Sequence, residues 1–265
     1  MDEATGSIAG TTVAEARTVV VIGAGTMGSG IAQTFAAAGW RVVLSDAAPE
    51  AVSAGMSRIG RAWQRDVEKG RSDQDELARR QAMLGTADDF TLAAAGADLV
   101  IEAIVENIGV KAGLFEQLGE CAPTDCILAS NTSSISISAL AAASTHADRV
   151  VGLHFFNPAP VLPLVEIVRG EQTSDDTIAR CQAIVEGLGK TPVVVHDAPG
   201  FVGNRILLPM INEAVACLED GVADAGAIDA VMQLGMNHPI GPLALADLIG
   251  LDVCVQILEV LHHDL

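Results

Sequence analysis

The sequence of 265 residues contains no tyrosine and few basic side chains, with 15 lysines and arginines against 34 aspartates and glutamates. The net charge of −19 repels polyanions and argues against nucleic acid as a partner, although a local basic cluster could still bind a small anionic substrate. No run of about twenty apolar residues occurs, so we expect no membrane-spanning helix. The N-terminus has no basic segment followed by an apolar one, so no secretory signal is expected.

Cysteine is also scarce. The five cysteines show no C-x-x-C spacing, and an odd number cannot all pair within one chain. Reduced thiols in a cytoplasmic protein are the simplest interpretation, and we expect neither a cysteine nucleophile nor a metal site. They are Cys121, Cys126, Cys181, Cys217 and Cys254.

Short apolar runs alternate with stretches of helical periodicity over the first 200 residues. Predicted strands cover residues 18–22, 41–45, 97–103, 126–129, 149–155, 163–168 and 192–196. Predicted helices cover residues 29–38, 49–69, 72–84, 111–121 and 175–188. This alternation predicts an α/β fold with a Rossmann-like, doubly wound and mostly parallel sheet.

The pattern changes after Gly200, and no strand is expected from there to the end of the chain. Helical periodicity predicts helices over 205–220, 225–234 and 243–261, and Pro209 should kink the first of them. Their apolar faces are broader than one small domain can bury, which indicates an interface and a homodimer. We therefore predict a disordered leader over 1–16, a dinucleotide-binding domain over 17–200 and a smaller all-α domain over 201–265.

The sequence Gly23-Ala-Gly-Thr-Met-Gly28 joins a predicted strand to a predicted helix. The first glycine permits the tight turn, the second lets the backbone approach a pyrophosphate, and the third lets the helix pack on the strand. Asp46, at the end of the next strand, can accept hydrogen bonds from the ribose of NAD and would repel the extra phosphate of NADP. We therefore expect NAD to contact Gly23, Gly25, Thr26, Met27, Gly28 and Asp46, the alternative being a glycine turn with no ligand.

His154 ends a second apolar run, and Glu166 lies in another run after Pro158, Pro160 and Pro163. The prolines forbid a helix and favour a chain reversal, which would bring the carboxylate within hydrogen-bond reach of the imidazole. Such a pair is typical of a general base held in orientation. The alternative is a histidine with only a structural role.

Further strings appear in a fixed order along the chain: Ala103-Ile-Val-Glu-Asn107 with Lys111, Ala129-Ser-Asn-Thr-Ser-Ser134, His154-Phe-Phe-Asn-Pro158 with Glu166, and Pro199-Gly-Phe-Val-Gly-Asn-Arg205. From about residue 17 onward the chain resembles the L-3-hydroxyacyl-CoA dehydrogenases, including the 3-hydroxybutyryl-CoA dehydrogenases. The resemblance implies NAD-dependent oxidation of a 3-hydroxyacyl-CoA to the 3-oxoacyl thioester, with His154 as general base and Glu166 orienting it.

The resemblance also assigns residues around the reacting atoms. Ser133 and Asn204 match positions that hydrogen-bond the reacting region, while Glu106, Lys111 and Asn157 match positions near the nicotinamide ribose. Simpler interpretations remain open at this point: Ser133 and Asn204 could each cap a helix, and Glu106 and Lys111 could form a surface ion pair.

A basic stripe follows Asp46 on one predicted helix, formed by Arg58, Arg61, Arg65 and Lys69. The family places a CoA-contacting lysine on this helix, and Lys69 is the nearest match, so the stripe, Arg61 included, is expected to meet the phosphates of an acyl-CoA. The alternative is a solvated face paired with Asp66 and Glu68. The family's usual tyrosine-containing C-terminal tail is not found before Leu265, so we expect a truncated helical domain.

Two other functions are weighed against this one. The first is a β-hydroxyacid dehydrogenase that acts on a free acid. The second is a non-catalytic NAD-binding protein, which would predict degraded catalytic positions.

Overall fold

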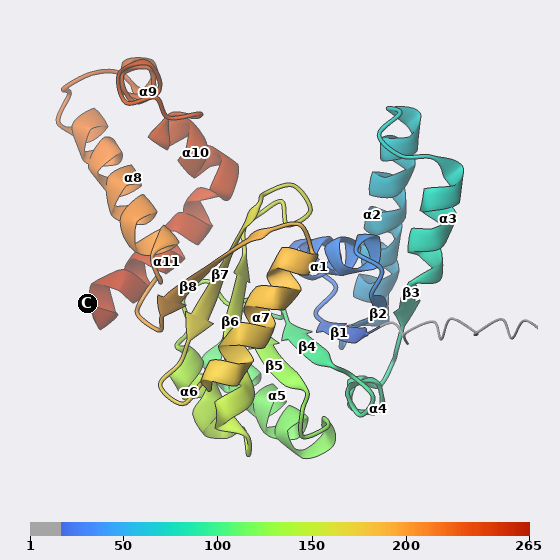
Figure 1. Cartoon of the computed structure of the whole chain (residues 1–265). Coiled ribbons are helices and arrows are strands. Elements are labelled where there is room, and N and C mark those ends of the chain that lie inside the picture. The colour runs from blue at the N-terminus through green and yellow to red at the C-terminus, as the bar shows by residue number, and fades with distance from the viewer. Residues whose placement is uncertain (1–16) are drawn as a thin grey trace, which may run out of the picture.

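An eight-stranded sheet forms the centre of the fold, in the order β3-β2-β1-β4-β5-β6-β7-β8 (Figure 1). The computed structural model describes residues 17–265, so the leader predicted over 1–16 lies outside the described residues. The strands are β1 (Thr18–Ile22), β2 (Arg41–Ser45), β3 (Leu84–Thr86), β4 (Leu99–Glu102), β5 (Ile127–Ser130), β6 (Val150–Phe155), β7 (Leu164–Arg169) and β8 (Thr191–His196). The first six strands in chain order run parallel, β7 is antiparallel to β6, and β8 is parallel to β7. The predicted fold class is confirmed.

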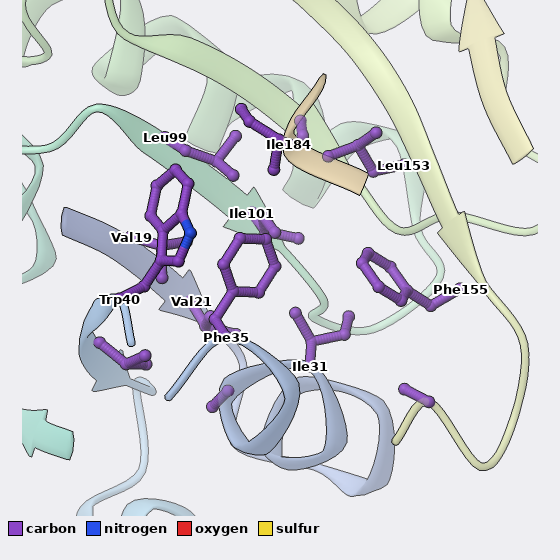
Figure 2. Close-up of a cluster of buried hydrophobic side chains, with 14 of the residues drawn as sticks. Val19, Val21, Ile31, Phe35, Trp40, Leu99, Ile101, Leu153, Phe155 and Ile184 are labelled. Carbon is purple, nitrogen blue, oxygen red and sulfur yellow. The ribbon is translucent and has the colours of Figure 1, made fainter. Parts of the chain in front are cut away.

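Helices cover both faces of this sheet (Figure 1). One face packs against α1 (Thr26–Ala37), α2 (Pro49–Glu68) and α7 (Asp175–Gly187). The other face packs against α4 (Phe90–Ala94), α5 (Ile108–Cys121) and α6 (Ile137–Ala143). Figure 2 shows Phe35 and Phe155 within the first cluster, with Ile31 and Ile101 beside them. Residues 19–22 of β1 and 99–101 of β4 are buried and apolar on both sides because helices exclude water from both faces.

The remaining helices form a separate group after β8, drawn in orange and red in Figure 1. They are α8 (Gly203–Glu219), α9 (Ala225–Ala230) with a π-helical extension (Val231–Gly235), α10 (Pro242–Ile249) and α11 (Leu251–Asp264). A small core containing Leu208, Ile211 and Ile257 joins α8, α10 and α11. The single helix predicted over 243–261 is wrong, because Gly250 takes a φ of +104° and divides α10 from α11.

Four short elements differ from the sequence expectation. The helix predicted over 72–84 is α3 (Gln74–Ala82), capped by Asp73, and Leu84 begins the short edge strand β3 (Leu84–Thr86). Helices α4 and α6 were not predicted, since five and seven residues are too few to show a period. Pro209 lies inside α8, which continues through it. No helix within residues 17–265 is long and apolar enough to cross a membrane.

Candidate active site

The turn between β1 and α1 is shaped by its glycines. Gly23 has a φ of +105°, and a side chain there would overlap the carbonyl of Ala103, which directly follows the neighbouring strand β4. A side chain at Gly28 would overlap the Gly23 carbonyl, whereas a Cβ at Gly25 meets no atom within 4 Å. The open space over Gly25 therefore leaves the backbone accessible to a ligand at the N-terminus of a 12-residue helix. Thr26 is exposed in the first helical turn, and Met27 packs against the core.

Asp46 closes the other side of this turn. Its carboxylate accepts hydrogen bonds from the N–H groups of Ala24 at 2.7 Å and Ala48 at 3.0 Å, which hold it at the end of β2. It lines a cavity of about 690 Å³ together with Ile22, Phe90 and Ile104. Asp88 and Asp89 line the same cavity, and a partly apolar cavity with carboxylates in its wall suits a nucleoside whose ribose hydroxyls can donate hydrogen bonds. The residues present thus fit a dinucleotide such as NAD.

His154 and Glu166 face each other across the antiparallel pair β6–β7, where they are direct register partners. Nδ1 of His154 lies 2.7 Å from Oε2 of Glu166, and both side chains are buried. The ring of His154 packs at 4.6 Å from Phe156 and 5.7 Å from Phe201, measured between ring centroids. The carboxylate and the aromatic rings fix the orientation of the imidazole and leave its Nε2 without a hydrogen bond among the described residues.

The Glu166 carboxylate also binds the first turn of the helical group. Its other oxygen, Oε1, accepts a hydrogen bond from the Gly203 N–H at 2.9 Å. Burial acts to raise the pKa of Glu166, but the hydrogen bonds from His154 and Gly203 outweigh burial and leave that pKa lowered. Glu166 therefore remains an anion beside the imidazole and at the same time ties β7 to α8.

Ser133 and Asn204 meet although 71 residues separate them in the sequence. The Asn204 amide donates to the Ser133 carbonyl at 3.2 Å, and the Ser133 N–H donates to Glu106 at 3.1 Å. Asn204 lies inside the first turn of α8, and α6, the helix after Ser133, is capped by Ser136, so neither residue is the helix cap that the simpler interpretation proposed. No hydrogen bond among residues 17–265 uses the Ser133 hydroxyl, which is half-buried.

Glu106 and Lys111 do form an ion pair, at 3.0 Å, but it is not a surface pair. Lys111 is 1% exposed and also binds Glu102 at 2.6 Å. Glu102 is fully buried at the end of β4, and its second oxygen accepts from the Ser130 hydroxyl at 2.6 Å. Sequence analysis did not identify Glu102, although a carboxylate that ends an otherwise apolar strand was a usable signal.

The basic stripe on α2 divides into two parts. Arg58 turns inward, and its Nη1 donates to the Ser29 hydroxyl at 2.7 Å and to the Gly25 carbonyl at 3.2 Å. Arg58 and the exposed Arg65 and Lys69 line a cavity of about 650 Å³ that reaches Thr26, Asn157 and Pro158. Arg61 is exposed but is not among the residues that line this cavity. The cavity therefore extends from the glycine turn to the basic end of α2.

Comparison with known proteins identifies both parts of the chain. A family model described as the 3-hydroxyacyl-CoA dehydrogenase NAD-binding domain matches residues 18–198, and one for the C-terminal domain matches residues 200–265. A Bacillus subtilis protein named "Probable 3-hydroxybutyryl-CoA dehydrogenase" is 51% identical, with 95% of this chain and 87% of that protein covered. The crystal structure of (S)-3-hydroxybutyryl-CoA dehydrogenase from Ralstonia eutropha has a TM-score of 0.90 at 46% identity, covering 94% of this chain and 88% of that one. The mitochondrial hydroxyacyl-coenzyme A dehydrogenase of Sus scrofa is 41% identical over 92% of this chain and 80% of its own.

Proposed function

The chain belongs to the 3-hydroxyacyl-CoA dehydrogenase family and is an NAD-dependent oxidoreductase acting on 3-hydroxyacyl-CoA, and we propose that His154 and Glu166 carry out its proton transfer. The observation that carries the proposal is the buried contact of 2.7 Å between His154 Nδ1 and Glu166 Oε2. With its Nδ1–H donated to the carboxylate, the imidazole presents the Nε2 lone pair as a base. Nε2 then takes the proton of the 3-hydroxyl group, and the imidazolium that forms is stabilised by Glu166.

The other site residues are proposed to hold the reactants together. NAD, when bound, accepts the hydride that leaves C3 of the substrate. Gly23, Gly25 and Gly28 would hold the dinucleotide at its pyrophosphate, and Asp46 would hold the adenosine ribose. Glu106, Lys111 and Asn157 are assigned to the nicotinamide ribose, and the free hydroxyl of Ser133 to the substrate oxygen. Asn204 supports this arrangement by fixing the Ser133 loop against α8.

The substrate is proposed to be a short 3-hydroxyacyl-CoA such as 3-hydroxybutyryl-CoA, which the names of the relatives support. Arg65 and Lys69 line the 650 Å³ cavity beside the glycine turn, so we assign them to the phosphates of coenzyme A. Arg61 was also predicted to bind the substrate, but it does not line that cavity, so we assign no phosphate contact to it.

We further propose a cytoplasmic homodimer formed through the helical residues 201–265, with residues 17–200 as the dinucleotide-binding domain. Large apolar side chains lie exposed on that helical part, among them Leu234 at 88% and Leu248 at 74% exposure. A second copy of the chain would remove them from water. Sedimentation equilibrium tests this assignment, and a monomer at micromolar concentration would contradict it.

The reaction assignment is tested by His154→Ala, with His196→Ala as the matched control. His196 also ends a strand but is exposed. The His154 variant should lose kcat for reduction of acetoacetyl-CoA by about 10²- to 10⁴-fold while it keeps NADH binding. The His196 variant should behave as wild type. Turnover of free 3-hydroxy acids in preference to the thioester would favour the free-acid alternative, and NADH binding without turnover in the wild type would favour a non-catalytic protein.

A further inference from the structure

We name the group of Glu102, Lys111 and Glu106 the Glu102 cluster. Its two negative charges are matched by one positive charge among the described residues. Glu102 is 0% and Lys111 1% exposed, and the one cation pairs with two carboxylates. No other salt bridge among residues 17–265 involves these three side chains. With two carboxylates and one ammonium group the cluster carries a net charge of −1; Glu102 and Lys111 are buried, the Glu106 side chain is 36% exposed, and a further positive charge nearby would be stabilised.

The hydrogen bonds of Glu102 hold its carboxylate in one place. Oε1 accepts from Lys111 at 2.6 Å and from the Ile104 N–H at 2.7 Å, and Oε2 accepts from Ser130 at 2.6 Å. On the other side of Lys111, Glu106 accepts from the Thr132 hydroxyl and the Ser133 N–H. Burial acts to raise the pKa of Glu106, but Lys111 and these donors lower it. Lys111 and these donors thus stabilise the charged form of Glu106.

The sheet order places this cluster on the path of the cofactor. The glycine turn follows β1, His154 lies on β6, and the strands between them are β4 and β5. Glu102 is the last residue of β4, in register with Ile22 of β1 and Ser130 of β5. A dinucleotide that starts at the glycine turn and delivers its ring beside His154 must cross these strand ends. The nicotinamide end of a bound dinucleotide would therefore lie near the Glu102 cluster.

We propose that the Glu102 cluster is an electrostatic selector for the oxidised cofactor. NAD⁺ and NADH share the same pyrophosphate, riboses and adenine, and they differ by one positive charge on the nicotinamide ring. A fixed net charge of −1 below the ring stabilises NAD⁺ and leaves the affinity for NADH nearly unchanged. This role rests on the proposed function, because it takes the ring to lie between the glycine turn and His154.

The size of the effect follows from Coulomb's law. One unit charge about 10 Å from the ring, at an effective dielectric constant of about 20 to 40, changes the binding constant by about 4- to 16-fold. Glu102→Gln removes that charge with almost no change of shape. The amide oxygen of the glutamine can still accept from Lys111, and its N–H₂ group can donate to the Ser130 hydroxyl after that hydroxyl rotates. The ratio Kd(NAD⁺)/Kd(NADH) should rise by this factor.

The experiment measures both dissociation constants on the cofactor-free protein, with NADH fluorescence and competition by NAD⁺ at fixed salt. Glu102→Asp keeps the charge and should restore a ratio within about twofold of wild type. Glu76→Gln removes an ion-paired carboxylate on α3, away from the cofactor turn, and controls for net charge. If both dissociation constants rise together in Glu102→Gln and their ratio is unchanged, the role of Glu102 is purely structural and the proposal is overturned. The proposal is also overturned if Glu102→Asp changes the ratio as much as Glu102→Gln does.

Lys111→Gln gives a second test that remains if Glu102→Gln does not fold. It makes the cluster more negative, so the ratio should fall instead of rise, and an increase or no change would overturn the proposal. His154→Ala separates this role from the reaction assignment. That variant should lose turnover but keep the wild-type ratio, so each assignment can fail while the other stands.

Discussion

Glu166→Gln tests the site most directly because glutamate there accepts hydrogen bonds at both oxygens. Oε2 accepts from His154 at 2.7 Å and Oε1 from the Gly203 N–H at 2.9 Å. A glutamine has one acceptor oxygen and one donor group. If the amide N–H₂ faces His154, the imidazole takes the tautomer with the proton on Nε2 and ceases to be a base. If it faces Gly203, two donors meet at the start of α8.

The loss of charge sets the expected magnitude. At an effective dielectric constant of about 20, opposite charges about 4 Å apart attract by about 4 kcal/mol, equivalent to about 10³-fold in rate. In the oxidation direction the imidazolium forms only during the reaction, so this loss should appear in kcat and leave KM for NAD near its wild-type value. The wrong tautomer adds to the loss.

The same carboxylate affects stability as a function of pH. Because hydrogen bonds from His154 and Gly203 overcome burial and lower the pKa of Glu166, its folded value lies below the unfolded value of about 4.3. Its contribution to stability is therefore fully present above the unfolded value and is lost as pH falls through the folded pKa. Glutamine does not titrate, so the difference in unfolding free energy between wild type and Glu166→Gln should be constant near neutral pH and shrink below about pH 4.

The assay follows the appearance of NADH from NAD and 3-hydroxybutyryl-CoA, together with thermal unfolding and NADH binding as checks of the fold. Glu186→Gln, on the exposed face of α7, is the control and should not differ from wild type. A kcat for Glu166→Gln within about fivefold of wild type, with the fold intact, would refute the proposed pair.

Three further variants or treatments follow from the structure. Gly25→Ala should raise the Kd of NADH at least about tenfold with a stability change within about 0.5 kcal/mol, because its Cβ meets no protein atom and the backbone φ is −66°. Lys69→Glu should raise KM for the acyl-CoA several-fold and Arg61→Glu should not, since only Lys69 lines the large cavity; equal effects would contradict the cavity assignment. Burial raises the pKa of the Cys126 and Cys181 thiols to about 12, so neither should react with iodoacetamide in the folded protein at about pH 8, as mass spectrometry of the labelled peptides can establish.

Local signals in the sequence predicted the central fold well. Apolar runs ending before Gly23 and before Asp46 marked β1 and β2, and the proline-rich connection marked the reversal that brings His154 opposite Glu166. The elements that sequence reasoning missed were short, such as β3 with three residues, or depended on one backbone angle, as at Gly250. Such elements are stabilised by contacts with segments that are distant in the sequence, and a pattern within a short stretch of sequence does not reveal those contacts.

The sequence alone determined the glycine turn, the carboxylate after β2 and the chemistry available at His154, because each depends on residues close together in the chain. Only the tertiary structure decided that Lys111 is buried between two glutamates and that Asn204 reaches Ser133 across 71 residues. It also showed that Glu166 holds both the imidazole and the first turn of α8. These contacts join separate segments, and burial sets the strength of their charges, so they arise only when the sheet and the helical group are packed together.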